Sequence, residues 1–126
     1  MNQQAQQIAN MFLEQYYGMM QAPRASRQGL VSFYSNASVL TYTGSSYRGL
    51  KDIAEKVESF GFEKIEYQNM NSDIQEGPIP GSILVLVNGW LQMDGSDQFR
   101  FSQLFNILPN GSGGYYIHND IFTTIL

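Results

Sequence analysis

The stretch Leu91–Phe101, LQMDGSDQFRF, holds the first candidates for chemistry in this sequence, two carboxylates in a turn. Asp94 and Asp97 lie in a Gly-Ser turn between two strongly apolar runs. Carboxylates at a hairpin tip usually serve only to solvate the turn. Acids beside apolar residues can also attract and orient a basic partner. From these residues alone we favour turn solvation.

The sequence has one histidine that could serve in acid–base catalysis, His118, near the middle of a predicted strand. Asp120 lies two residues later and would face the same side of a regular strand, which allows a His–Asp pair. No serine is marked as a nucleophile, and the sequence has no nucleophile elbow, phosphate-binding loop or H-E-x-x-H motif. We therefore favour a structural role for His118 and predict no catalytic residue.

An enzyme could instead use a cavity at the open end of a curved sheet, with an acid placed for proton abstraction. Tyr42, Tyr67 and Asp94 would lie near the mouth of such a cavity. Asp94 belongs to a turn, where water keeps a carboxylate ionised, whereas a catalytic acid of this type needs an apolar enclosure. A small-molecule isomerase or dehydratase is therefore kept as an alternative only.

Metal binding has few ligands to draw on, because the chain has no cysteine and one histidine. Any site would need carboxylate oxygens. Asp52, Glu55 and Glu58 are spaced along one predicted helix with Lys51 and Lys56 between them, which is typical of a solvated helix face. We expect no metal and no cofactor.

The composition excludes several classes of partner. Of 126 residues, 7 are lysine or arginine, and the net charge is -4. Nucleic-acid binding needs clustered basic residues, so we expect none. No apolar run approaches the roughly 20 residues of a membrane span, and the N-terminus lacks the pattern of a secretory signal. The absence of cysteine suits a reducing compartment.

Apolar spacing predicts three helices in the first half of the chain. The first covers Gln3–Met20, where apolar residues recur every three or four positions. Pro23 suits the first turn of a second short helix that ends at Tyr34. A hairpin around Gly44–Ser46 precedes a third helix over 50–60, which a glycine ends.

From residue 63 the apolar period changes from helical to alternating, which predicts strands. Clusters rich in glycine and proline separate them and favour an antiparallel meander. The predicted strands are Glu63–Gln75, Ser82–Met93, Gln98–Leu108 and Gly113–Leu126. Helices followed by a meander predict an α+β domain with the helices on one face of the sheet.

The other face of this sheet is predicted to be partly apolar. Leu84, Leu86 and Trp90 alternate with the apolar side chains that face the helices. A sheet exposed to water on its back would carry polar residues there. We therefore predict a homodimer in which two sheets pair about a two-fold axis.

Five segments occur in an order and at a spacing that resemble the nuclear transport factor 2 family. They are FLEQYYGMM, FYSNASVLTYTG, YRGLKDIAEKVESFGFEKIEY, FRFSQLFNI and YIHNDIF. The resemblance covers the whole chain, residues 1–126, as a single domain. It implies a cone-shaped, curved antiparallel sheet with three helices packed on one face, a homodimer through the sheet, and no enzymatic activity.

The resemblance also implies partners and a location. Members of this family carry the GDP-bound form of the small GTPase Ran into the nucleus, and they bind Phe-x-Phe-Gly repeats of nucleoporins. An aromatic side chain of Ran enters an apolar cavity that is rimmed by acids. The protein would then occur in the cytoplasm, the nucleus and the nuclear pore of the envelope. A peptide-binding interaction module outside transport is a further alternative.

The Ran site of the family can be carried over position by position. Asp94 aligns with an acid that pairs with a Ran lysine, whereas the second acid falls at Ser96, one position before Asp97. A Trp-Glu pair of the family is Tyr42-Thr43 here, so an aromatic ring is kept and a carboxylate is lost. The predicted Ran-binding residues are Tyr42, Thr43, Phe60, Phe62, Ile65, Leu91, Met93, Asp94, Asp97, Phe99, Ile121 and Phe122.

The site for nucleoporin repeats is expected on the first helix. The aromatic residue of the family aligns near Ala5, and an alanine cannot sandwich a phenylalanine ring. Ile8 and Met11 would leave an apolar groove between two subunits. Ala5, Ile8 and Met11 are therefore the predicted nucleoporin-binding residues.

Overall fold

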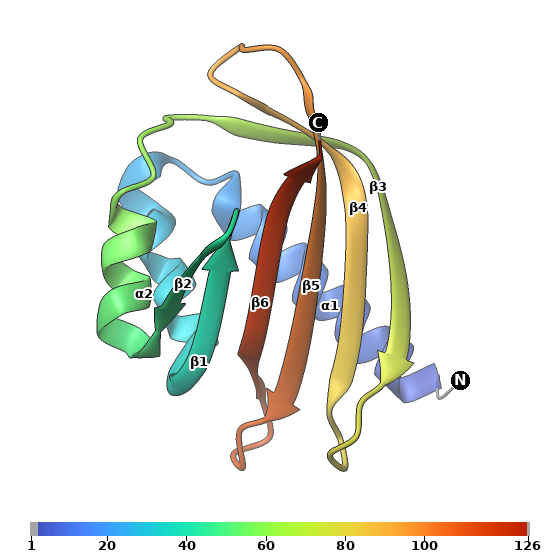
Figure 1. Ribbon diagram of the computed structural model, residues 1–126. Helices are drawn as coiled ribbons and strands as arrows, with labels where there is room; N and C mark the ends of the chain where they lie inside the picture. The colour runs from blue at the N-terminus through green and yellow to red at the C-terminus, as the bar shows by residue number, and fades with distance from the viewer. Residues whose placement is uncertain (1–2, 126) are drawn as a thin grey trace.

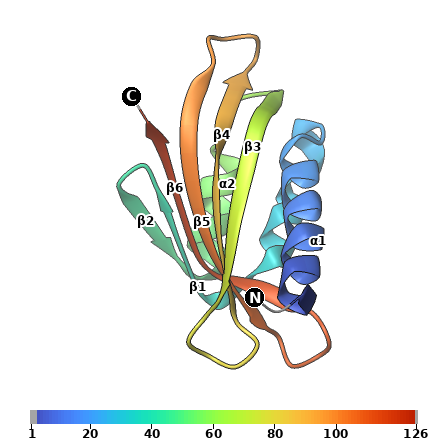
Figure 2. The same cartoon turned by 90° about the vertical axis from the view of Figure 1, so that its right-hand side faces the viewer.

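Three helices lie on one side of a curved sheet (Figures 1 and 2). The computed structural model describes residues 3–125. The helices are α1, Gln3–Met20; η1, a 3-10 helix over Arg24–Phe33; and α2, Gly49–Glu58. None of these described helices is long and apolar enough to span a membrane.

The sheet has six strands in the spatial order β2-β1-β6-β5-β4-β3. Their bounds are β1, Tyr34–Tyr42; β2, Ser45–Arg48; β3, Ile65–Glu76; β4, Ile83–Met93; β5, Phe99–Pro109; and β6, Tyr115–Ile125. The predicted α+β class, the helices on one face and the four-stranded meander are confirmed.

One strand pair departs from the predicted antiparallel sheet. β1 runs parallel to β6, whereas the other neighbouring pairs are antiparallel. Parallel neighbours need a long crossover connection. Here α2 and the β3–β5 meander lie between β1 and β6 in the chain and provide that connection, so the sheet is mixed.

Helix α1 covers the sheet with aromatic side chains. Ala5, Ala9 and Tyr16 are buried and recur at helical spacing, so one face of α1 turns to the core. Phe12 and Tyr16 both place ring edges against Phe105 of β5, with 4.9 Å between ring centroids in each pair. Phe105 is fully buried, and removing such a ring usually costs about 3–5 kcal/mol.

The second helix ends earlier than predicted. Tyr34 is the first residue of β1, not the last residue of the helix. Its hydroxyl donates a hydrogen bond to Asp120 of β6, with 2.7 Å between the oxygens. This partner is distant in sequence, so the local apolar pattern could not place Tyr34.

A bulge in β6 decides which of its side chains face the helices. The pairing of β6 with β5 shifts by one residue at His118. As a result, Ile117 and Asp120 are both fully buried. His118 contacts Asn119 instead of Asp120, with 2.7 Å between Nδ1 and Oδ1. The His118–Asp120 pair that a regular strand would allow is therefore not formed.

The face of the sheet opposite the helices carries apolar side chains from three strands. Leu86 of β4 and Ile121 and Ile125 of β6 are 39%, 45% and 40% exposed. Leu84, Leu86 and Leu104 of β5 line one groove together. The partly apolar outer face predicted from strand alternation is therefore present.

Thr43 turns the chain between β1 and β2 with a φ of 47°. This conformation costs a non-glycine residue about 1–2 kcal/mol, whereas glycine adopts it readily. We expect Thr43→Gly to raise the free energy of unfolding by about 0.5–1 kcal/mol, measured by urea denaturation. Thr41→Gly, at a regular position of the same hairpin, should lower it. A similar loss in both variants would show that Thr43 is not strained.

Candidate functional site

An apolar cavity lies between the helices and the sheet. It is lined from α1, η1, α2, β1 and the four strands of the meander. β1 and β6 end near it, and the segment between α2 and β3 passes over the same end of the sheet (Figure 1). Gln103, Thr124 and tyrosine hydroxyls supply its polar atoms, and the rest of the lining is aliphatic or aromatic.

Stacked rings form much of the cavity wall. Tyr42 stacks on Phe122 with 4.9 Å between centroids and 13° between ring planes. Phe60 stacks on Phe62 with centroids 5.7 Å apart, and Tyr42 lies 5.4 Å from Phe60. Such a wall presents ring faces and edges, which favour contact with another aromatic ring.

The cavity is small in this conformation. Its volume is about 40 Å³, whereas an apolar cavity that binds benzene has about 150 Å³. A phenyl ring therefore enters only if lining side chains move. Met20 and Met93 are both in the lining, and methionine changes its rotamer at low cost. Met93 is partly exposed and Met20 is buried, so Met93 is better placed to open the cavity.

Behind the cavity, a hydrogen-bond network holds a buried carboxylate. Tyr34 Oη donates to Asp120 Oδ2 at 2.7 Å, and Gln103 Nε2 donates to Asp120 Oδ1 at 2.8 Å. Tyr17 Oη donates in turn to Gln103 Oε1 at 2.7 Å. Burial raises the pKa of Asp120 to about 6, although the two hydrogen bonds to the carboxylate oppose this rise.

The cavity offers no ionised group to a ligand. Its lining contains no carboxylate, histidine, lysine or arginine. Asp120 is fully buried, and both of its oxygens accept hydrogen bonds. Burial raises the pKa of Tyr16 and of Tyr34, so their hydroxyls stay protonated. Residues 3–125 also contain no cluster of acidic or histidine side chains that could hold a metal ion.

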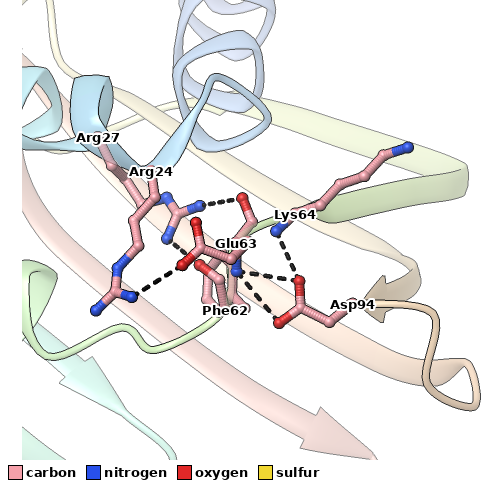
Figure 3. Close-up of polar contacts among 6 residues, drawn as sticks. All are labelled: Arg24, Arg27, Phe62, Glu63, Lys64 and Asp94. Atoms are coloured by element: carbon pink, nitrogen blue, oxygen red, sulfur yellow. Dashed lines mark hydrogen bonds and ion pairs between the residues drawn. The ribbon is translucent and has the colours of Figure 1, made fainter.

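Arg27 of η1 holds the segment Phe62–Lys64, which contributes Phe62 to the cavity wall (Figure 3). It donates to the carbonyl oxygens of Phe62 and Glu63 at 2.8 and 3.1 Å. Its guanidinium carbon lies 4.1 Å from the centroid of the Phe62 ring. Arg27 is buried, and these contacts replace part of the water that its charge would otherwise require, although its Nε has no hydrogen-bond partner among the described residues.

Asp94 holds the same segment from the opposite side (Figure 3). Its Oδ1 accepts hydrogen bonds from the backbone N–H groups of Glu63 and Lys64 at 3.0 and 2.8 Å. Its own backbone N–H donates to Lys64 O at 2.9 Å. The carboxylate of Asp94 is therefore engaged within the protein, where it positions one wall of the cavity.

Asp97 is the more available acid of the turn. It is exposed, and its carboxylate makes no ion pair or hydrogen bond with any residue in the described range 3–125. Glu63, by contrast, pairs with Arg24 at 3.0 Å. Asp94 and Asp97 of the same turn thus differ, because only the carboxylate of Asp94 is engaged by the described residues.

Most of the predicted Ran-binding residues line the cavity. They are Tyr42, Phe60, Phe62, Ile65, Leu91, Met93 and Phe122. Thr43, Asp94 and Asp97 lie in turns outside the lining, and Phe99, at the start of β5, is 38% exposed.

Ile121 does not line the cavity, and its part in Ran binding stays a prediction. Its neighbours Asp120 and Phe122 are buried toward the helices. Successive side chains of a strand point to opposite faces. Ile121 therefore lies on the outer face of the sheet, where it is 45% exposed.

The polar part of the lining was not predicted from the sequence. Tyr16, Tyr34 and Gln103 contribute to it. Strand alternation carried a signal for Gln103, because it shares a face of β5 with Phe101 and Phe105. No local signal marked Tyr34, since its position depends on the buried contact with β6.

The predicted nucleoporin-binding residues lie in different environments. Ala5 and Ile8 line a groove with Gly81, Ile83 and Tyr115. Ala5 is 6% exposed, which leaves little of its side chain for a partner. Met11 does not line this groove and is 61% exposed. The structure brings Ala5 and Ile8 together and leaves Met11 apart.

A family model, two curated relatives and one solved structure identify the family of this chain. The model of the family described as "Nuclear transport factor 2 (NTF2) domain" matches residues 8–124. Nuclear transport factor 2 of Emericella nidulans is 36% identical over 95% of this chain and 94% of its own length. That of Saccharomyces cerevisiae is 36% identical over 91% and 90%. The structure of nuclear transport factor 2 from Cryptosporidium parvum has a TM-score of 0.90, at 32% identity, over 98% of this chain and 97% of that one.

The buried carboxylate should make stability depend on pH. The carboxyl of an unfolded aspartate ionises near pH 4, whereas folded Asp120 keeps its proton up to about pH 6. Ionisation thus favours the unfolded chain, and Asp120 should lower the free energy of unfolding by about 2 kcal/mol as the pH rises from 4 to 7. In Asp120→Asn this loss should be absent. Parallel stability curves for both proteins, from urea titrations across this range, would contradict the assignment.

Proposed function

Because this chain belongs to the nuclear transport factor 2 family, we propose that it is a non-enzymatic carrier for the GDP-bound form of Ran. In this role it shuttles between cytoplasm and nucleus and passes the pores of the nuclear envelope by binding Phe-x-Phe-Gly repeats of nucleoporins. The relatives reported above are named as nuclear transport factors, which supports a role in transport.

The apolar cavity is the observation that carries this proposal. A carrier that catalyses no reaction needs a site that recognises one shape of its cargo. A cavity walled by aromatic rings can recognise a protruding aromatic side chain. Such a ring buries about 150–250 Å² when it is fully enclosed. The lining has no charged group, so the ring enters without leaving a buried charge unpaired.

Arg27 and Asp94 hold Phe62–Lys64 from two sides. This arrangement suits such a site, because it keeps one wall of the cavity in place while the opposite wall moves. Arg27 and Asp94 together make contacts with the backbone of all three residues of this segment. Met93 supplies the adaptable side. Selectivity for one nucleotide state follows if only the GDP-bound form presents its aromatic side chain.

Asp97 provides the negative charge at the rim. Thr43 cannot supply a carboxylate, and the carboxylate of Asp94 already accepts backbone hydrogen bonds. Asp97 is exposed, so it can pair with a basic residue beside the inserted ring. Exposed pairs contribute little affinity but orient the partner and speed its association.

Nucleoporin repeats are assigned to the groove beside the start of α1. Ile8, Ile83 and Tyr115 give it apolar walls. Ala5 is small, so the groove lacks an aromatic partner for a phenylalanine ring from this chain. We expect weak binding that releases quickly, which suits a protein that must keep moving through the pore.

The outer face of the sheet is proposed as the dimer interface. Leu86, Ile121 and Ile125 are exposed there in one chain, and a second copy can cover them about a two-fold axis. Homodimer interfaces are more apolar than other protein surfaces, which fits this face better than the helix-covered one.

Titration with purified Ran tests the carrier proposal. We expect micromolar binding to Ran loaded with GDP and at least about tenfold weaker binding to Ran loaded with GTP, measured by calorimetry. Asp97→Asn should weaken binding about two- to fivefold and reduce its dependence on salt. Asp52 is an exposed acid on α2, and Asp52→Asn should leave the affinity and its dependence on salt unchanged. No binding, or equal binding to both nucleotide forms, would end the proposal.

The dimer interface can be tested without any partner. Leu86→Glu places a charge in the proposed contact, so this variant should sediment as a monomer at micromolar concentration while the wild type sediments as a dimer. Ile79→Glu is the matched control, because Ile79 lies between β3 and β4 and is 50% exposed. A dimer that survives Leu86→Glu but not Ile79→Glu would place the interface elsewhere.

A further inference from the structure

Lys56 of α2 points its ammonium group into a cluster of three aromatic rings beside the cavity. Its Nζ lies 4.6 Å from the centroid of Tyr42, 5.3 Å from that of Tyr47 and 5.8 Å from that of Phe60. Tyr42 and Phe60 also line the cavity. Two of the rings that would receive a partner's aromatic side chain, Tyr42 and Phe60, therefore already contact a cation.

No acid of the described chain neutralises Lys56. Asp52 lies one helical turn earlier, at a spacing that often gives an ion pair, yet Lys56 forms no ion pair within residues 3–125. Glu58 accepts a hydrogen bond from Gln28 at 2.7 Å instead. Because the ammonium contacts aromatic rings and no carboxylate, its positive charge is not compensated by an acid of the described chain.

Two further acids near this end of the sheet are engaged elsewhere. Glu63 pairs with Arg24, and Asp94 accepts hydrogen bonds from backbone N–H groups. Ring faces attract a cation but give its N–H groups only weak acceptors. Lys56 is half-buried, so the ammonium keeps donors available for an oxygen atom that a ligand brings.

We propose that the cavity mouth selects an aromatic group with a negative charge next to it, and that Lys56 is the residue that reads this charge. The inference rests on the ring-binding cavity of the proposed function and adds a charge requirement to it. The ring enters the cavity and contacts Tyr42, Phe60 and Phe122 of its wall, and the carboxylate remains outside as an acceptor for the ammonium. In a protein partner, this chemistry is an acidic residue beside the inserted aromatic residue.

The mouth of the cavity then carries one positive and one negative side chain. Lys56 gives a positive charge on the side of α2, and Asp97 gives a negative charge in the β4–β5 turn. A segment with an acid on one side of its aromatic residue and a base on the other fits in one orientation only, because reversal would bring like charges together. Lys56 thus determines specificity and does not supply the main binding energy, which comes from the ring.

Two small probes of nearly equal shape test the charge requirement without Ran. They are 3-phenylpropanoate and 3-phenylpropylammonium, titrated at constant ionic strength into uniformly ¹⁵N-labelled protein and followed by NMR shifts of the cavity-lining residues. We expect the wild type to bind the carboxylate probe about fivefold more tightly than the ammonium probe. Lys56→Met keeps the unbranched stem without the charge, and it should bind both probes equally.

Lys51→Met is the matched control, because it removes the same charge from an exposed position on the same helix. This variant should keep the wild-type preference. Equal binding of both probes by the wild type, a preference for the ammonium probe, or a preference that survives Lys56→Met would overturn the proposal. Absence of any shift in the cavity residues with either probe would overturn it as well.

The ring contacts of Lys56 can be measured in the same samples. Protons held over ring faces move upfield, so the ε-methylene protons of Lys56 should resonate upfield of those of Lys51. Coincident shifts would show that the ammonium does not rest on the rings. If Ran binds and the probes show no charge preference, only this inference fails; if the probes behave as expected and Ran does not bind, the carrier proposal fails alone.

Discussion

The hydrogen-bonded carboxylate of Asp120 is the constraint on which the rest of the structure depends. A carboxylate in an apolar core is costly unless its oxygens are paired. Here the hydroxyl of Tyr34 and the amide of Gln103 pair them, and Tyr17 fixes that amide in turn. One group thereby connects α1, β1, β5 and β6. It also holds β1 beside β6 in a parallel pairing and places Tyr34 and Gln103 at the back of the cavity.

The cavity in front of this network has little free space in this conformation. Its rings pack against one another, and its free volume is too small for a phenyl group. The clamp of Arg27 and Asp94 fixes the segment that carries Phe62, whereas Met93 can change its rotamer. Binding of a ring thus requires a local side-chain movement and no change of fold. In the proposed complex, the charges of Lys56 and Asp97 select which ring-bearing segment enters.

Local pattern predicted much of this architecture. Helical spacing placed α1 and α2, and alternation with glycine-rich turns placed the meander, because one face of each element must be buried. Local pattern did not place Tyr34 in a strand or separate His118 from Asp120, and the residues carried over from the family did not show that Ile121 lies on the outer face of the sheet. Each of these depends on a contact or a register shift involving residues far away in the sequence. A one-residue bulge reverses the face of every later side chain, and a single sequence does not mark where it occurs.

The sequence by itself determined the family and the α+β class, which follow from the order of residue types along the chain, and the resemblance to the family then supplied most of the apolar lining. Tertiary structure decided what the acids and the cation do. Asp94 and Asp97 are three positions apart in one turn, yet only Asp94 reaches the backbone of Glu63 and Lys64. Lys56 looked like a solvated helix residue, and only the approach of β1 and β2 to α2 brings Tyr42 and Tyr47 to its ammonium. Charge is a local property of the sequence, but its role is set by which groups folding brings near it.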